Sequence, residues 1–373
     1  MLGSAATRLT IVWAIALCSF WAIATICGQV GRPALAVALP RSPVEVLSNW
    51  DGNHYRYLTK HGYSEATEER RRLNLFPLFV GAAYLLGGSN HAAIAGILLN
   101  QLLLLGSMLL LTGFSDDGRT APLREQPGFW LLISPFAFFF WTFYTESLFL
   151  FLSLVMTLAV HRRFYVLAFI AGILAGLARP TAVLLPLLFA FDLWEPARRG
   201  ERLRILAVIA APLLGILLYV GAVAVATGDP LGYLAVHAKW DAKAENEWTV
   251  PFFPMYDALF WYWINSLAIG TLEPSEIPLA AASTAFVGLL VVLYGWRKPV
   301  LNYLPYLLIS ILVIHAQYPF RSTARYELVL FPVYLLAARS FLAKRWLFPF
   351  VAVASIAEQL YLFIRFADWK WVA

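Results

Sequence analysis

Charged side chains are scarce in this sequence of 373 residues. Asp, Glu, Lys and Arg together make up 13% of it, whereas a soluble domain usually carries roughly a quarter. The hydrophobic share is 61%, and the mean hydropathy is +0.69. So little polar surface cannot coat a globule in water. The composition therefore excludes an ordinary soluble protein and indicates a membrane protein.

Cysteine is also rare, because Cys18 and Cys27 are the only two. They fall on one expected helix, and at roughly 100° per residue their spacing points them to opposite sides of it. A bond between them is excluded, and they carry no information about the redox compartment.

Several signatures of enzyme sites are missing from the sequence. It has no Walker loop, no GxGxxG motif entering a helix and no GxSxG elbow, so a nucleotide cofactor is not expected. Asp51, His54 and His61 lie close together, but no zinc spacing such as HExxH occurs. A metal site at these three residues is therefore only a weak alternative, and we assign no metal ligands and no cofactor.

The sequence is rich in long apolar runs. Thr10 to Gly28 contains no charged residue, and about 19 residues at 1.5 Å each cross a hydrocarbon core. A signal peptide ending near Ala34 or Ala36 is the alternative for this run, but the run is long for one and further spans follow. These follow at 91–113, 204–226, 279–296 and 346–366. The runs predict an all-α, polytopic membrane protein.

Short basic clusters separate the apolar runs and set the expected topology, because short loops rich in Lys and Arg stay in the cytoplasm. With these loops inside, the shorter apolar segments pair as 128–141 with 144–160, 164–177 with 180–195, and 302–316 with 326–343. We expect about eleven spans in a single domain over 1–373. The net charge of +6 is attributed to this sorting of cations and not to nucleic-acid binding.

The same topology gathers polar segments on the outer side of the membrane. The first large outer loop, 29–90, holds an apolar run at 74–87 of about 14 residues, which predicts an interfacial or re-entrant helix. The second, 227–278, begins with Gly228-Asp229-Pro230, which predicts a turn followed by an interfacial helix. The segments 141–146 and 315–326 lie on the same side.

The first candidate for chemistry is Asp51, about 20 residues beyond the first span. It lies between Trp50 and Gly52, with His54 nearby, and a helix would place Tyr55 on its face one turn on. A carboxylate near the membrane surface with aromatic neighbours suits a general base acting on an acceptor hydroxyl. The alternative is an aspartate that caps a short helix or forms an Asx turn.

Glu146 and Arg179 are ionisable residues inside strongly apolar sequence. Glu146 lies between two apolar runs, and Arg179 stands where Pro180 interrupts another. A charge at such depth is expensive and indicates function by default. A guanidinium at a helix break also suits an anion such as phosphate. The alternatives are a glutamate that reaches water at the interface and an arginine that snorkels from a helix end.

Arg321 and Arg325 are four positions apart, so a helix would set both on one face. Two arginines opposite an outer carboxylate make a clamp for a phosphate or pyrophosphate. The alternative is a pair of snorkelling residues at the membrane boundary. Tyr326 follows in the same segment.

The order of these motifs resembles the PIG-V family, which contains the second mannosyltransferase of GPI-anchor assembly and its prokaryotic relatives. The resemblance extends from about Trp50 to Pro332 and depends on the motifs as a group. They are Trp50-Asp51-Gly52, Leu75-Phe76-Pro77-Leu78, Ser134-Pro135-Phe136, Tyr144-Thr145-Glu146-Ser147, Ala178-Arg179-Pro180-Thr181, Gly228-Asp229-Pro230, and Arg325-Tyr326 near Phe331-Pro332.

The resemblance implies a GT-C fold with a helical first outer loop, and a polyprenyl-phosphate mannose as donor. It implies Asp51 as the base and places Glu146, Arg179 and Arg325 in the site, to which we add Arg321 from its spacing. The arginines are expected to hold the donor phosphate. The remaining expected site residues are Trp50, His54, Tyr55 and Tyr326.

The expected reaction transfers mannose to a hydroxyl of a lipid or glycan acceptor, with inversion. The chain is shorter than a eukaryotic member would be, which favours a prokaryotic plasma membrane with an extracytoplasmic site over a GPI acceptor. Two alternatives come from other classes. A transporter or flippase of lipid-linked saccharides also uses intramembrane arginines and broken helices, although the sequence shows no repeat symmetry. A non-catalytic scaffold for envelope assembly is the second.

Overall fold

The chain is helical almost throughout the part that the structure describes. In the described ranges, the exception is an antiparallel pair of two-residue strands, β1 (Glu247–Trp248) and β2 (Gln317–Tyr318). The predicted all-α class is therefore confirmed. The computed structural model describes residues 4–30, 40–63, 76–114, 120–192, 200–229, 247–269, 276–297, 300–318, 320, 322–370 and 372.

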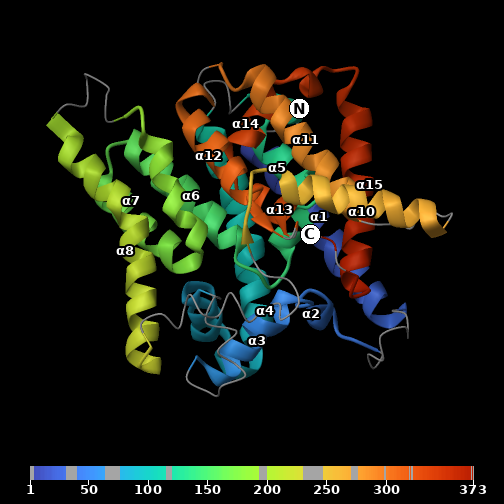
Figure 1. Ribbon diagram of the computed structural model, residues 1–373, viewed down its shortest axis with the longest axis horizontal. Coiled ribbons are helices and arrows are strands. Elements are labelled where there is room, and N and C mark those ends of the chain that lie inside the picture. The colour runs from blue at the N-terminus through green and yellow to red at the C-terminus, as the bar shows by residue number, and fades with distance from the viewer. Residues whose placement is uncertain are drawn as a thin grey trace.

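Long apolar helices form the framework of the fold (Figure 1). Five described helices are long and apolar enough to cross a membrane, and they coincide with the long runs of the sequence. The chain is an integral, multi-pass membrane protein, while the expected total of about eleven spans stays a prediction. These helices are α1 (Ala5–Val30), α4 (Pro77–Leu111), α8 (Arg202–Thr227), α11 (Glu276–Tyr294) and α15 (Phe348–Ala367).

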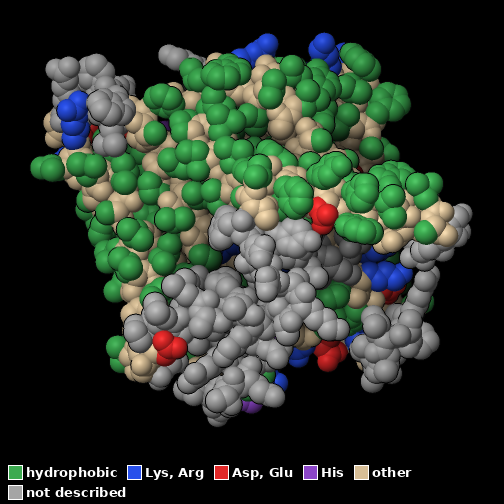
Figure 2. Space-filling model, viewed as in Figure 1, with side chains coloured by type: hydrophobic (Ala, Val, Ile, Leu, Met, Phe, Trp, Pro, Cys, Tyr) green, Lys and Arg blue, Asp and Glu red, His purple; other side chains and the backbone are tan. Residues whose placement is uncertain are grey.

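The space-filling view shows how apolar the outside of this framework is. Hydrophobic side chains cover the face over the long helices, and charged side chains are few among them (Figure 2). Leu85, Leu203 and Val225 are more than four-fifths exposed. Apolar side chains in such numbers are stable on the outside of a protein only against lipid.

The shorter apolar segments are packed among these helices. Two of the expected short segments are broken helices, because 128–141 breaks at Ser134 and 326–343 breaks between Leu328 and Phe331. Protein covers both breaks, and such burial lets irregular backbone persist at membrane depth. The segments are α5 (Pro127–Ile133), η5 (Ala137–Trp141), α6 (Glu146–His161), α7 (Tyr165–Ala178), η6 (Pro180–Phe189), α12 (Leu304–Ile314), α13 (Thr323–Glu327) and α14 (Pro332–Arg339).

The two segments that were expected to be large outer loops, 29–90 and 227–278, contain helices of their own. α4 begins at Pro77 and kinks at Gly88, which has a positive φ of 60°, so residues 77–87 of the apolar run expected over 74–87 form the first part of α4. Residues 74 and 75 of that run lie outside the described part. In the second loop, the residues after Asp229 where an interfacial helix was expected lie outside the described part. The other short elements are α2 (Pro43–Val46), α3 (Asp51–His61), η3 (Thr112–Phe114), η4 (Leu123–Glu125), α10 (Phe253–Ile269), η8 (Val300–Tyr303) and η9 (Phe341–Ala343).

Glycines let α7 and α8 approach closely. A Cβ atom at Gly176 of α7 would overlap the carbonyl oxygen of Pro212 and stand 3.0 Å from the Cα of Gly215 on α8. Small residues at such a crossing allow the two backbones to pack without separating them. The contact matters for the site because α7 ends at Ala178, directly before Arg179.

We predict that Gly176→Ala destabilises the protein by about 1–3 kcal/mol, because the added methyl group forces the two helices apart. Thermal unfolding in detergent measures the effect. Gly221→Ala on α8 is the matched control, since a Cβ atom at Gly221 meets nothing within 4 Å. Equal melting temperatures for the two variants would show that the close approach is not required.

Candidate active site

The segment between α1 and α4 carries Asp51, whose carboxylate reaches Arg325. Asp51 is the first residue of α3, and the preceding Trp50 has an unusual positive φ of 56°. No side chain caps this end of α3. The carboxylate is instead directed to Arg325, so the capping alternative does not describe this aspartate. Backbone strain of this kind is typical of functional sites, where surrounding contacts hold it in place.

Asn49 holds this turn in position. Its Nδ2 donates hydrogen bonds to the carbonyl oxygens of Phe366 and Ala367, at 2.9 and 3.1 Å, at the end of α15. Arg41 donates to the same carbonyl of Ala367 at 2.7 Å. The hydroxyl of Tyr144 donates to the carbonyl of Asn49 at 3.0 Å. The residues before Asp51 are thus tied both to α15 and to the turn that precedes Glu146.

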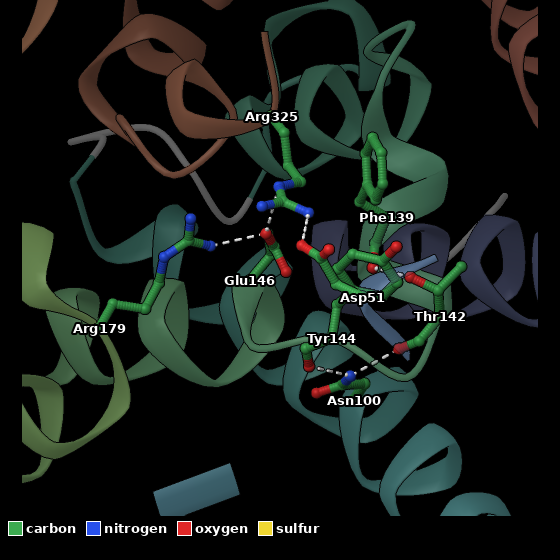
Figure 3. A network of polar contacts seen from close by, with 8 residues as sticks. All are labelled: Asp51, Asn100, Phe139, Thr142, Tyr144, Glu146, Arg179 and Arg325. Carbon is green, nitrogen blue, oxygen red and sulfur yellow. Dashed lines mark hydrogen bonds and ion pairs between the residues drawn. The ribbon is translucent and has the colours of Figure 1, made fainter. Parts of the chain in front are cut away.

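Four side chains of alternating charge contact one another in the order Arg179, Glu146, Arg325, Asp51 and form a chain of charges in the site (Figure 3). Arg179 Nη1 lies 2.7 Å from Glu146 Oε1, and Arg325 Nε lies 3.3 Å from the same oxygen. Arg325 Nη1 in turn donates to Asp51 Oδ2 at 2.7 Å. The four residues come from distant parts of the sequence, and their formal charges sum to zero.

Exposure within this chain of charges is lowest at Glu146 and highest at Asp51. The side chain of Glu146 is 1% exposed and that of Arg179 is 6%, whereas Arg325 is 11% and Asp51 is 25% exposed. Buried charges are tolerated only when they are paired, and Glu146 pairs with both guanidiniums. The arrangement has a fixed, buried end and an accessible end, and Asp51 is at the accessible end.

Aromatic rings surround the two guanidiniums. The Cζ of Arg325 lies 5.7, 5.3 and 5.5 Å from the ring centroids of Phe139, Tyr144 and Tyr326. Arg179 lies 5.1 Å from the ring of Tyr326, which therefore contacts both arginines. Such contacts stabilise a cation and fix its orientation.

The surroundings also set the protonation of two of these groups. Burial alone would lower the pKa of Arg325, but the carboxylates of Asp51 and Glu146 more than offset it and hold the pKa well above its usual range. Burial raises the pKa of the Tyr55 phenol, and the charges of Glu146 and Asp51 add to the shift. At neutral pH Arg325 is therefore a cation and Tyr55 a neutral hydroxyl.

A small pocket opens at the contact between Asp51 and Arg325. Its empty volume of about 230 Å³ includes open solvent. Ser322, at its rim, has a positive φ of 57°, as Trp50 does on the other side. The pocket is lined by Trp50, Asp51, Phe139, Tyr144, Ser322, Arg325, Phe366 and Val372.

A second buried pair holds the short helix that carries Arg325. His315 Nε2 lies 2.8 Å from Glu327 Oε1, and both side chains are less than 5% exposed. The ring of His315 stacks on Phe252, with centroids 5.0 Å apart. Because Glu327 and Arg325 are both on α13, this pair fixes α13 against the end of α12.

The structure brings together four of the residues selected from the sequence: Asp51, Glu146, Arg179 and Arg325. The helix that carries Arg325 begins at Thr323. Arg321 lies outside the described residues, so its pairing with Arg325 stays a prediction. The other predicted site residues have different environments. Trp50 lines the pocket, Tyr55 is buried behind it, Tyr326 contacts both arginines and His54 is partly buried on α3.

Sequence reasoning missed Phe139, Tyr144 and the buried amide of Asn100. Asn100 Nδ2 donates to the carbonyl oxygens of Thr142 and Tyr144, both at 2.7 Å, and so holds the turn that precedes Glu146. A polar amide inside the apolar run 91–113 was the available signal. Within the described ranges, no group of three or more His, Cys, Asp or Glu side chains is placed to hold a metal ion.

Comparison with known proteins gives a likeness in structure only. No family model matches the sequence, and no curated protein matches it. ArnT from Cupriavidus metallidurans, solved with undecaprenyl phosphate bound, is similar with a TM-score of 0.52 and 14% identity, over 89% of this chain and 60% of ArnT. The oligosaccharyltransferase AglB from Archaeoglobus fulgidus, solved with an inhibitory peptide and a dolichol-phosphate, gives 0.46 and 12%, over 97% of this chain and 56% of AglB.

This chain therefore spans 60% of the length of ArnT. At such low identity the likeness shows the fold alone, and the GT-C architecture expected from the sequence is confirmed. Membership of the PIG-V family stays a prediction.

Proposed function

We propose that this chain is a membrane glycosyltransferase that moves a sugar from a polyprenyl-phosphate donor to a hydroxyl group of a lipid or glycan acceptor. The observation that carries the proposal is the chain of charges ending on Asp51. It combines two guanidiniums suited to a phosphate with one accessible carboxylate suited to a base. The GT-C fold supports the proposal, as does the undecaprenyl phosphate bound to ArnT.

Arg325 and Arg179 are the groups that we assign to the donor phosphate. As the bond between the sugar and the phosphate oxygen breaks, its electron pair stays on that oxygen and negative charge grows there. Fixed guanidiniums in a site shielded from water stabilise such charge strongly. The rings of Tyr326 and Tyr144 hold the guanidinium of Arg325 in place for this task.

Asp51 is the group that we assign to the acceptor. The acceptor oxygen attacks the anomeric carbon while Asp51 removes its proton, and a single displacement inverts the configuration at that carbon. From the resemblance of the motifs we propose mannose as the sugar. From the topology we propose an extracytoplasmic site in a prokaryotic plasma membrane.

Proteoliposomes supplied with a mannosyl polyprenyl phosphate test the proposal. We expect the protein to release polyprenyl phosphate and to form an inverted mannoside in a membrane extract that supplies acceptors. Donor that crosses the bilayer without being consumed would instead indicate a transporter. Donor that is neither consumed nor moved would indicate a scaffold.

In the same assay, Arg325→Gln should weaken the interaction with the donor. A hydrogen bond to a charged group contributes about 1.5–3 kcal/mol, or about 10- to 150-fold in affinity, so KM should rise within that range. Arg297→Gln is the matched control, because Arg297 follows α11 and is not a member of the chain of charges. An unchanged KM for Arg325→Gln would remove Arg325 from the phosphate site.

A further inference from the structure

We propose that Asp51 and the phosphate of the lipid compete for Arg325, so that phosphate binding frees Asp51 and the returning carboxylate of Asp51 helps to expel the product. This inference rests on the function proposed above. It adds a second task for Asp51, which is to limit how tightly the site holds a polyprenyl phosphate.

Two nitrogen atoms of Arg325, Nη1 and Nε, already face carboxylates. Its Nη1 donates to Asp51 Oδ2 at 2.7 Å, and its Nε faces Glu146 Oε1 at 3.3 Å. Rings of Phe139, Tyr144 and Tyr326 surround the guanidinium at 5.3–5.7 Å. An anion that binds Arg325 through Nη1 therefore has to take the place of Asp51.

The carboxylates of Glu146 and Asp51 differ in how easily an anion can displace them from the arginines. Glu146 is 1% exposed and its Oε1 pairs with both arginines, so its displacement would leave a buried charge uncompensated. Asp51 is 25% exposed and lines the pocket, so water can solvate it once it leaves Arg325. An incoming phosphate therefore displaces Asp51 and leaves Glu146 in place.

Pairing with Arg325 also engages one oxygen of the Asp51 carboxylate. While Oδ2 accepts a hydrogen bond from Nη1 of Arg325, that lone pair is directed at the guanidinium and not at an acceptor hydroxyl. When phosphate takes over Nη1, Oδ2 becomes available for the proton of the acceptor hydroxyl.

The phosphate product carries more negative charge than the donor. The donor is a phosphodiester with one negative charge, whereas the released polyprenyl phosphate is a monoester with a charge near −1.5 to −2 at neutral pH. The more charged product would hold the arginines more tightly than the donor does. The like charge of Asp51 beside it, and the return of Asp51 to Arg325, oppose this retention.

The test is the affinity of the purified, full-length protein for undecaprenyl phosphate in detergent micelles. Asp51→Asn removes the competing charge and should lower the Kd about tenfold or more, an outcome opposite to that expected if Asp51 simply contributed to binding. Asp257→Asn on α10 makes the same change of charge at a residue that does not line the pocket and should leave the Kd unchanged. In Asp51→Asn/Arg325→Gln the gain should disappear, because the contested guanidinium is gone.

The possible failures are distinct. If neither the wild type nor Asp51→Asn binds the lipid, the proposed function itself is overturned. If the wild type binds and Asp51→Asn binds equally well or more weakly, the competition is overturned while the proposed function stands. If Asp257→Asn gains as much as Asp51→Asn, net charge is the cause and the competition is again overturned. Asp51→Ser removes the same charge and replaces Asp51→Asn if that variant does not fold.

Discussion

Asp51→Asn is expected to reduce sugar transfer by about 10²–10⁴-fold, the usual contribution of a general base. The amide has nearly the shape of the carboxylate but cannot take the proton of the acceptor hydroxyl. The turnover of a mannosyl polyprenyl phosphate in proteoliposomes measures the loss. Because the same variant is expected to bind undecaprenyl phosphate more tightly, affinity and turnover should move in opposite directions.

Two companion variants make this result interpretable. Asp257→Asn should keep wild-type turnover, since Asp257 is on α10 and is not among the residues that line the pocket. Asp51→Glu keeps the carboxylate but moves it by one methylene group, so it should recover part of the activity. Turnover of Asp51→Asn within threefold of the wild type would remove Asp51 from the role of base.

Glu146→Gln is expected to destabilise the protein by about 3–5 kcal/mol, the usual result of removing one partner of a buried ion pair. Its carboxylate is the counter-ion shared by Arg179 and Arg325, at 2.7 and 3.3 Å, and all three side chains are almost fully buried. The variant leaves Arg179 without its charged partner. Thermal unfolding in detergent measures the loss, and sugar transfer should fall with it.

The control for this change is an ion pair at the surface. Glu125 pairs with Arg124 at 2.7 Å but is 42% exposed, so Glu125→Gln should change stability by at most about 1 kcal/mol. Replacing the buried pair together, as Glu146→Leu/Arg179→Met, should restore much of the stability without restoring activity, because apolar residues of similar volume replace buried charges well. Equal stability of Glu146→Gln and Glu125→Gln would show that the chain of charges does not contribute to the stability of the fold.

The membrane class and the long helices could be predicted from the sequence because they depend on local composition. A run such as Thr10 to Gly28 is long enough and apolar enough to cross a bilayer wherever its neighbours lie. The broken segments could not be predicted in the same way. Ser134 ends α5 inside an apolar run, and only the protein packed around 127–150 makes such a break tolerable.

The candidate site, too, could be predicted from the sequence only in part. Glu146, Arg179 and Arg325 could be selected from the sequence because a charge inside apolar sequence is costly and needs a reason. Their partners could not, since pairing depends on contacts between residues far apart in the chain. Helical spacing suggested Arg321 as the neighbour of Arg325, but α13 begins only at Thr323.

The sequence by itself thus determined that the chain enters the membrane many times and which ionisable residues need an explanation. The tertiary structure alone decided that Glu146 is shared by two arginines and that Asp51 is the accessible end of the chain of charges. The physical reason is that the free energy of transferring an apolar segment from water into the membrane depends on the composition of that segment alone. The stability of a buried charge, in contrast, depends on which other charges the fold places within about 4 Å of it.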